Sequence, residues 1–238
     1  MEAFDINLRR NSDLNRGSAP FQAGRTMLWL HKTGEAEELL NQAIAAGDQA
    51  HLALAYRSLL KRMKTDARGA LEDAEKALRQ APDCFEAHAA RAVALLLDPR
   101  RLVDAMESYG HASNCTPRDA EGHFLNLILY LLFTEMLINS VEKPNGDIEL
   151  RMKLTPATIT ATRILEGNHA MALKEMNSAG TSLLFYIGMG LSFYRLGDYA
   201  TANEAFRALL EESPEVPNAR TVLSVKRLKF EAAKLMQG

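Results

Sequence analysis

Glycine, proline and cysteine are all scarce in this chain of 238 residues. With 14 glycines and 8 prolines, few positions would interrupt a helix, so we expect helix over most of the length. Two cysteines are too few for a disulfide framework, and the first residues lack the apolar core of a signal peptide. We therefore expect a protein of the reducing cytoplasm.

An excess of charge of one sign is lacking as well. The formal net charge is −2, so no basic field would draw the chain to nucleic acid or to an anionic membrane. One apolar stretch, residues 120–139, approaches the length of a membrane span, but Asn126, Thr134 and Glu135 interrupt it. We interpret this stretch as a core helix that is covered on both sides, and we expect no membrane insertion.

Motifs of the common enzyme classes are also missing. The sequence contains no glycine-rich phosphate loop, no HExxH, no GxSxG and no DxDxDG. Its carboxylates are scattered along the faces of expected helices. We therefore expect no enzymatic activity, no catalytic residues and no cofactor.

What the sequence does contain is an ordered alternation of bulky and small residues between 183 and 214. Gly190 has no side chain and would let a second helix approach closely, with Ala202 as the small residue that could face it. Gly197 tolerates a positive φ and would end the first helix. Asp198 then offers a carboxylate to the free amides of the second helix. The stretch predicts two helices joined by a tight turn.

The spacing within residues 183–214 resembles one complete tetratricopeptide repeat. Residues 51–82 and 86–117 match this pattern more loosely, because their first helices lack its aliphatic–glycine pair. The resemblance implies an all-α fold, a right-handed α-solenoid of antiparallel helix pairs, that serves as a scaffold or adaptor for protein binding. The positions that carry the resemblance are Tyr186, Met189, Gly190, Phe193, Gly197, Asp198, Ala202, Phe206 and Pro214.

An internal repeat supports the same architecture. The small and bulky positions of one expected second helix return at the same intervals in the next, with a period close to that of this family. Ala70, Ala74, Ala77 and Pro82 are followed 35 residues later by Ala105, Tyr109, Ala112 and Pro117.

The expected domain organisation is simple. Residues 1–18 are polar and predict a flexible N-terminal arm, and residues 19–238 predict a single solenoid domain. Within it, 140–155 interrupt the helical rhythm, and a period-two pattern near the dipeptide Asn145–Gly146 predicts a β-hairpin or extended loop at 140–154. An amphipathic C-terminal helix at 217–236 is expected to cap the last repeat.

The resemblance also nominates a binding surface, because the first helices of such repeats line a concave groove. The expected lining is mainly apolar with two arginines, which suits an extended or helical segment that offers hydrophobic anchors and a carboxylate. For each residue the alternative is packing against a neighbouring helix. The carboxylate clamp for chaperone tails is not expected, because 51–64 and 86–97 contain no asparagine. The candidates are Tyr56, Leu59, Ala90, Arg91, Ala94, Ile187, Gly188, Leu191, Tyr194 and Arg195.

A metal site is a weaker hypothesis. Cys84 and His88 begin one expected helix, and His111 and Cys115 end its antiparallel partner, so both pairs fall at the same end of the hairpin. Two thiolates and two imidazoles would suit tetrahedral zinc. Helix spacing alone produces such pairs by chance, however, and we assign no metal beyond this candidate set.

Two further function classes remain open at this point. One is a self-assembling structural protein whose apolar edges or hairpin pair between copies, so that the chain forms a homo-oligomer. The other is a regulatory protein with a small ligand between its helices, which would require a pocket with convergent polar groups.

Overall fold

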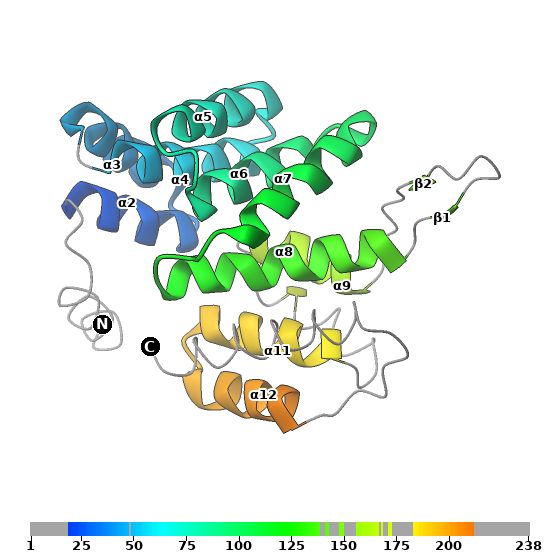
Figure 1. Cartoon of the computed structure of the whole chain (residues 1–238). Coiled ribbons are helices and arrows are strands. Elements are labelled where there is room, and N and C mark those ends of the chain that lie inside the picture. The colour runs from blue at the N-terminus through cyan, green and yellow to red at the C-terminus, as the bar shows by residue number, and fades with distance from the viewer. Residues whose placement is uncertain are drawn as a thin grey trace.

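The computed structural model describes residues 19–47, 49–138, 141–142, 148–149, 156–166, 168, 171–172 and 183–211. These residues fold almost entirely into antiparallel pairs of helices, which confirms the all-α solenoid expected from the sequence (Figure 1).

Three helix pairs form the N-terminal stack. Each pair packs on the next, with α3 against α4 and both α4 and α5 against α6. A short 3₁₀ turn, η1 (Pro99–Arg101), lies between the helices of the third pair. The pairs are α2 (Ala19–Trp29) with α3 (Thr33–Ala46), α4 (Ala50–Met63) with α5 (Ala67–Gln80), and α6 (Phe85–Leu95) with α7 (Leu102–Asn114).

A long helix, α8 (Ala120–Ile138), runs between this stack and the C-terminal helices (Figure 1). It contacts α6 and α7 on one side, and α9 (Pro156–Leu165) and α11 (Leu183–Leu196) on the other. The last described helix is α12 (Tyr199–Glu211), which pairs with α11. Because α8 is covered from both sides, its apolar residues are buried around most of the helix, as expected. No helix in the described part of the chain has the length and apolarity needed to span a membrane.

Small residues allow the paired helices to approach closely. Ala70, Ala74 and Ala77 on α5 are fully buried, and so are Ala105 and Ala112 on α7. These are the recurring small positions of the sequence, and all five lie in the buried interior. Ridges of larger side chains can then fit into the grooves that the alanines leave.

The α11–α12 turn has the local chemistry that the sequence predicts. Gly197 has φ of +81°, in the left-handed region that favours glycine. Asp198 accepts hydrogen bonds from the backbone N–H of Thr201 at 3.1 Å and from its hydroxyl at 2.7 Å. Gly190, however, lies nearest to the ring of Phe206, rather than to Ala202 as expected, and a Cβ there would be 2.3 Å from the ring. The small residue of α11 therefore makes room for a large one of α12.

A short hairpin interrupts the helices after α8. β1 (Val141–Glu142) and β2 (Ile148–Glu149) pair antiparallel, with Val141 opposite Glu149 and Glu142 opposite Ile148. A hairpin within 140–154 is therefore confirmed, although the expected Asn145–Gly146 turn lies outside the described residues. The N-terminal arm at 1–18 and the capping helix at 217–236 also lie outside them and stay predictions.

Candidate functional site

Three distant segments converge at the start of α8. The Arg25 guanidinium on α2 donates to Asp119 at 2.5 Å, just before α8 begins. The Arg195 guanidinium on α11 donates to both carboxylate oxygens of Glu121, in the first turn of α8, one of them at 3.2 Å. The first and the last described helix pairs are thus tied to the same end of one helix.

Aromatic rings enclose the second of these ion pairs. The Arg195 guanidinium lies 3.6 Å from the centre of the Phe124 ring and 4.3 Å from that of Trp29. The two rings meet edge to face, with centres 5.5 Å apart. A desolvated guanidinium against aromatic faces is held by charge and by stacking together. We call this cluster, which consists of Arg25, Trp29, Asp119, Glu121, Phe124 and Arg195, the inner junction.

Five of the ten groove residues nominated by the resemblance lie inside the fold. Their side chains pack between the first helices of successive pairs, so they offer no open surface in this arrangement. Their contact with a partner stays a prediction, and it would require the helices to separate. The buried members are Tyr56, Leu59, Ala90, Ala94 and Leu191.

The remaining nominated residues have other partners. Arg91 donates to the hydroxyl of Ser108 on α7, so it spans the α6–α7 pair. Tyr194 stacks on Phe124, and Arg195 belongs to the inner junction. Ile187 and Gly188 belong to α11, but their surroundings lie outside the part of the structure that is described.

The four candidate zinc ligands make contacts of other kinds in the structure. The rings of His88 and His111 stack with centres 5.3 Å apart. The Cys84 thiol donates to Glu86 at 3.4 Å, and the Cys115 thiol donates to the carbonyl of His111 at 3.4 Å. Within the described ranges, no group of three or more histidine, cysteine, aspartate or glutamate side chains is arranged to hold a metal ion.

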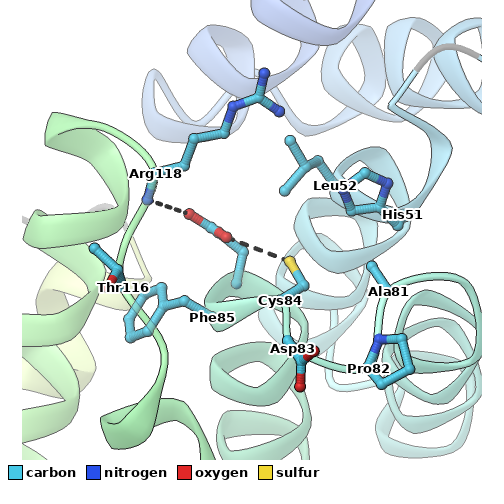
Figure 2. A pocket seen from close by; sticks show the side chains of 10 residues that line it. His51, Leu52, Ala81, Pro82, Asp83, Cys84, Phe85, Thr116 and Arg118 are labelled. Atoms are coloured by element: carbon cyan, nitrogen blue, oxygen red, sulfur yellow. Dashed lines mark hydrogen bonds between the residues drawn. The ribbon is translucent and has the colours of Figure 1, made fainter.

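A pocket of about 400 Å³ opens where α4 and α6 begin, on the side reached by the α7–α8 loop (Figure 2). We call it the edge pocket. Its position at the rim of the stack leaves it accessible, whereas the inner junction is closed. Its lining consists of His51, Leu52, Ala81, Pro82, Asp83, Cys84, Phe85, Glu86, Thr116 and Arg118.

Glu86 forms the floor of the edge pocket and holds the α7–α8 loop in place. Its carboxylate is only 4% exposed. One oxygen accepts from the backbone N–H of Arg118 at 3.2 Å, and the other accepts from the thiol of Cys84 (Figure 2). A Cβ on Gly122 would lie 2.8 Å from the first oxygen, so the glycine lets Glu86 reach this position without a shift of its side chain.

Burial controls the ionisation of the two acidic groups at this floor. Burial raises the pKa of Glu86 above its ordinary value. Burial, together with the nearby Glu86 carboxylate, raises the pKa of Cys84 to about 12. The thiol therefore stays protonated at neutral pH, and because the thiolate is the nucleophilic form, Cys84 is not suited to nucleophilic catalysis.

Arg118 and His51 give the upper wall of the edge pocket a positive character. The side chain of Arg118 is exposed and extends past Leu52, as Figure 2 shows, and its guanidinium has no hydrogen-bond or ion-pair partner among the described residues. Partial burial and then the charge of Arg118 lower the pKa of His51. No signal in the sequence predicts this wall, since His51 and Arg118 belong to no motif and only folding brings the two segments together.

Comparison with known families matches the tetratricopeptide repeat at residues 64–111 and 187–225. The first range covers α5, α6 and most of α7, and the second covers most of α11 and all of α12. Comparison with curated proteins finds no match. Among solved structures, a thermophilic tetratricopeptide-repeat protein of Thermus thermophilus is similar, with 14% identity, 90% of this chain and 97% of that chain covered, and a TM-score of 0.43.

Proposed function

Because residues 64–111 and 187–225 match the tetratricopeptide repeat, we propose that this chain is a non-catalytic scaffold that binds a segment of another protein. Repeats of this family generally mediate protein–protein interactions. The family match is the observation that carries the proposal. The protonated thiol of Cys84 and the scattered carboxylates are consistent with a binding role rather than a catalytic one.

The rim of the N-terminal stack is the surface that we propose for binding. Of the nominated concave positions whose surroundings are described, five are buried, and Arg91, Tyr194 and Arg195 contact Ser108, Phe124 and Glu121, so a partner would have to displace contacts made within the chain. The edge pocket needs no such displacement. It combines apolar groups such as Leu52 and Phe85 with the exposed side chain of Arg118, a mixture typical of sites that orient a ligand.

Selection of binders from a displayed peptide library tests the function. Peptides recovered on the purified full chain are titrated by calorimetry, and saturable one-to-one binding is expected. Hydrogen exchange on the complex then locates the site, with protection expected at the starts of α4 and α6 and in the loop at 116–118. Repeated selections without any saturable binder would overturn the scaffold function. Protection confined to α11 and α12 would overturn the proposed surface.

A further inference from the structure

We propose that the edge pocket is an anchor site for a carboxylate carried by the bound segment, which Arg118 and His51 would hold together. This inference rests on the proposed binding function and names the partner's chemistry. The site lies at the rim, where α4 and α6 begin, and shares no residue with the groove positions nominated by the family resemblance.

The size of the pocket suits one anchoring group with its neighbours. Its volume of about 400 Å³ falls in the range of about 300 to 1,000 Å³ that is usual for small-ligand sites. Leu52, Phe85 and Pro82 supply apolar surface against which a side-chain stem or a backbone can lie. The polar groups that line the pocket then determine whether a bound group of positive or negative charge is favoured.

The charges around the pocket favour an anion on the side of Arg118. Both oxygens of Glu86 already accept hydrogen bonds from within the chain, and burial raises the pKa of this carboxyl group. The Cys84 thiol is protonated and donates to Glu86. Asp83 is exposed and lies on the opposite side of the pocket from Arg118 in Figure 2. Among the described residues that line the pocket, Arg118 is the permanently charged cation, and no partner of its guanidinium lies in the described ranges. A guanidinium binds a carboxylate through two parallel hydrogen bonds.

His51 supplies a second hydrogen-bond donor, and its pKa can report whether a carboxylate is bound. With its pKa lowered by burial and by Arg118, the ring is neutral at pH 7 and can donate one N–H. A carboxylate placed between His51 and Arg118 would offset the positive charge of the guanidinium, so the pKa of His51 would rise on binding. Asp83, Cys84 and Glu86 are the other titratable groups that line the pocket.

The test compares library selection on the wild-type chain and on Arg118→Gln. Arg118→Gln keeps the backbone N–H that donates to Glu86, so we expect the variant to fold. Its melting temperature, compared with that of the wild type, checks this. Peptides selected on the wild type are expected to share an acidic residue or an acidic terminus. Their affinity is expected to fall about tenfold on Arg118→Gln. Arg68→Gln, at the opposite end of α5 from the pocket and 91% exposed, is the matched control and should leave affinity unchanged.

Three forms of the enriched peptide identify the carboxylate. The parent is compared with an analogue in which aspartate or glutamate is replaced by its amide, and with an analogue that has a C-terminal amide. Loss of affinity in the first analogue assigns a side chain, and loss in the second assigns the terminus. NMR titration of His51 should show a raised pKa with the parent alone.

The outcomes separate the two proposals. Binders that lack an acidic group, or that bind Arg118→Gln as tightly as the wild type, would overturn the carboxylate site and leave the scaffold function standing. An unchanged His51 pKa in the saturated complex would also overturn it. Failure to recover any saturable binder would overturn both.

Discussion

Individual residues decide the stability of the second helix pair. Asp73 on α5 is 0% exposed, and its carboxylate accepts from Arg57 at 2.7 and 2.8 Å. The ammonium of Lys61 lies 2.8 Å away, and Arg57 reaches on to Asn41 of α3 at 2.6 Å. Burial alone would raise the pKa of Asp73, but the hydrogen bonds from Arg57 and Lys61 outweigh it and lower the pKa. A single carboxylate thus joins three helices.

Asp73→Asn is expected to destabilise the chain by about 2–4 kcal/mol, because it leaves two part-buried cations without their counter-charge. The lowered pKa has a second consequence. The stability that the ionised group contributes is present above its unfolded pKa of about 3.9 and is lost as pH falls through the lower folded value. Urea denaturation at pH 7 and at pH 3 measures the free energy of unfolding. Its decrease between these two pH values should be smaller for Asp73→Asn than for the wild type.

Glu72→Gln is the matched control, because Glu72 precedes Asp73 and pairs with the exposed Arg68 only on the surface. It should change stability little at either pH. Equal effects of the two substitutions would show that the network around Asp73 contributes nothing specific.

At the scale of the element, close approach of the two helices defines the α11–α12 pair. Phe206 is fully buried, and its ring occupies the space in front of Gly190. The ring cannot move aside cheaply because its other faces are packed. The sequence pattern predicted that Gly190 permits a close contact, but it could not say which residue of α12 would use the space, since several bulky and small residues share that helix.

Gly190→Ala is expected to destabilise the pair by about 1–3 kcal/mol through overpacking against Phe206. Gly110→Ala on α7 is the control, since a Cβ there meets nothing within 4 Å, and this substitution should be neutral or stabilising by up to about 1 kcal/mol. Thermal unfolding followed by circular dichroism measures both. If Gly190→Ala matched or exceeded the stability of Gly110→Ala, the close contact would be refuted.

At the scale of the whole molecule, the inner junction converts a row of helix pairs into a closed arrangement. Arg25 and Asp119 are 94 residues apart, and Arg195 and Glu121 are 74 apart. In a simple solenoid each repeat contacts only its neighbours. Here α2 and α11 both reach the start of α8, so helices from distant parts of the chain are joined at one point.

Arg195→Met should weaken the contact between α11 and the start of α8. The substitution leaves Glu121 without its ion pair and removes the cation from between Trp29 and Phe124, so we expect a loss of about 3 kcal/mol. Trp29 is the single tryptophan and is 8% exposed, so its fluorescence should shift to the red as water reaches it. Small-angle scattering should show a larger radius of gyration.

Arg207→Met on the exposed face of α12 serves as the control and should change neither fluorescence nor radius. An unchanged Trp29 emission in a folded Arg195→Met protein would mean that the inner junction does not hold the two ends together.

The sequence by itself determined the helix pairs, because the side chains that form a pair lie within about 35 residues and repeat with a helical period. It also predicted the hairpin at 140–154, since alternation and a turn dipeptide are local signals. Only the tertiary structure decided which faces stay open. The inner junction and the edge pocket join residues from segments far apart in the chain, and no local spacing encodes how such segments meet. The burial of Tyr56 and Leu191, and the lack of a partner for the Arg118 guanidinium among the described residues, become visible only in the folded chain.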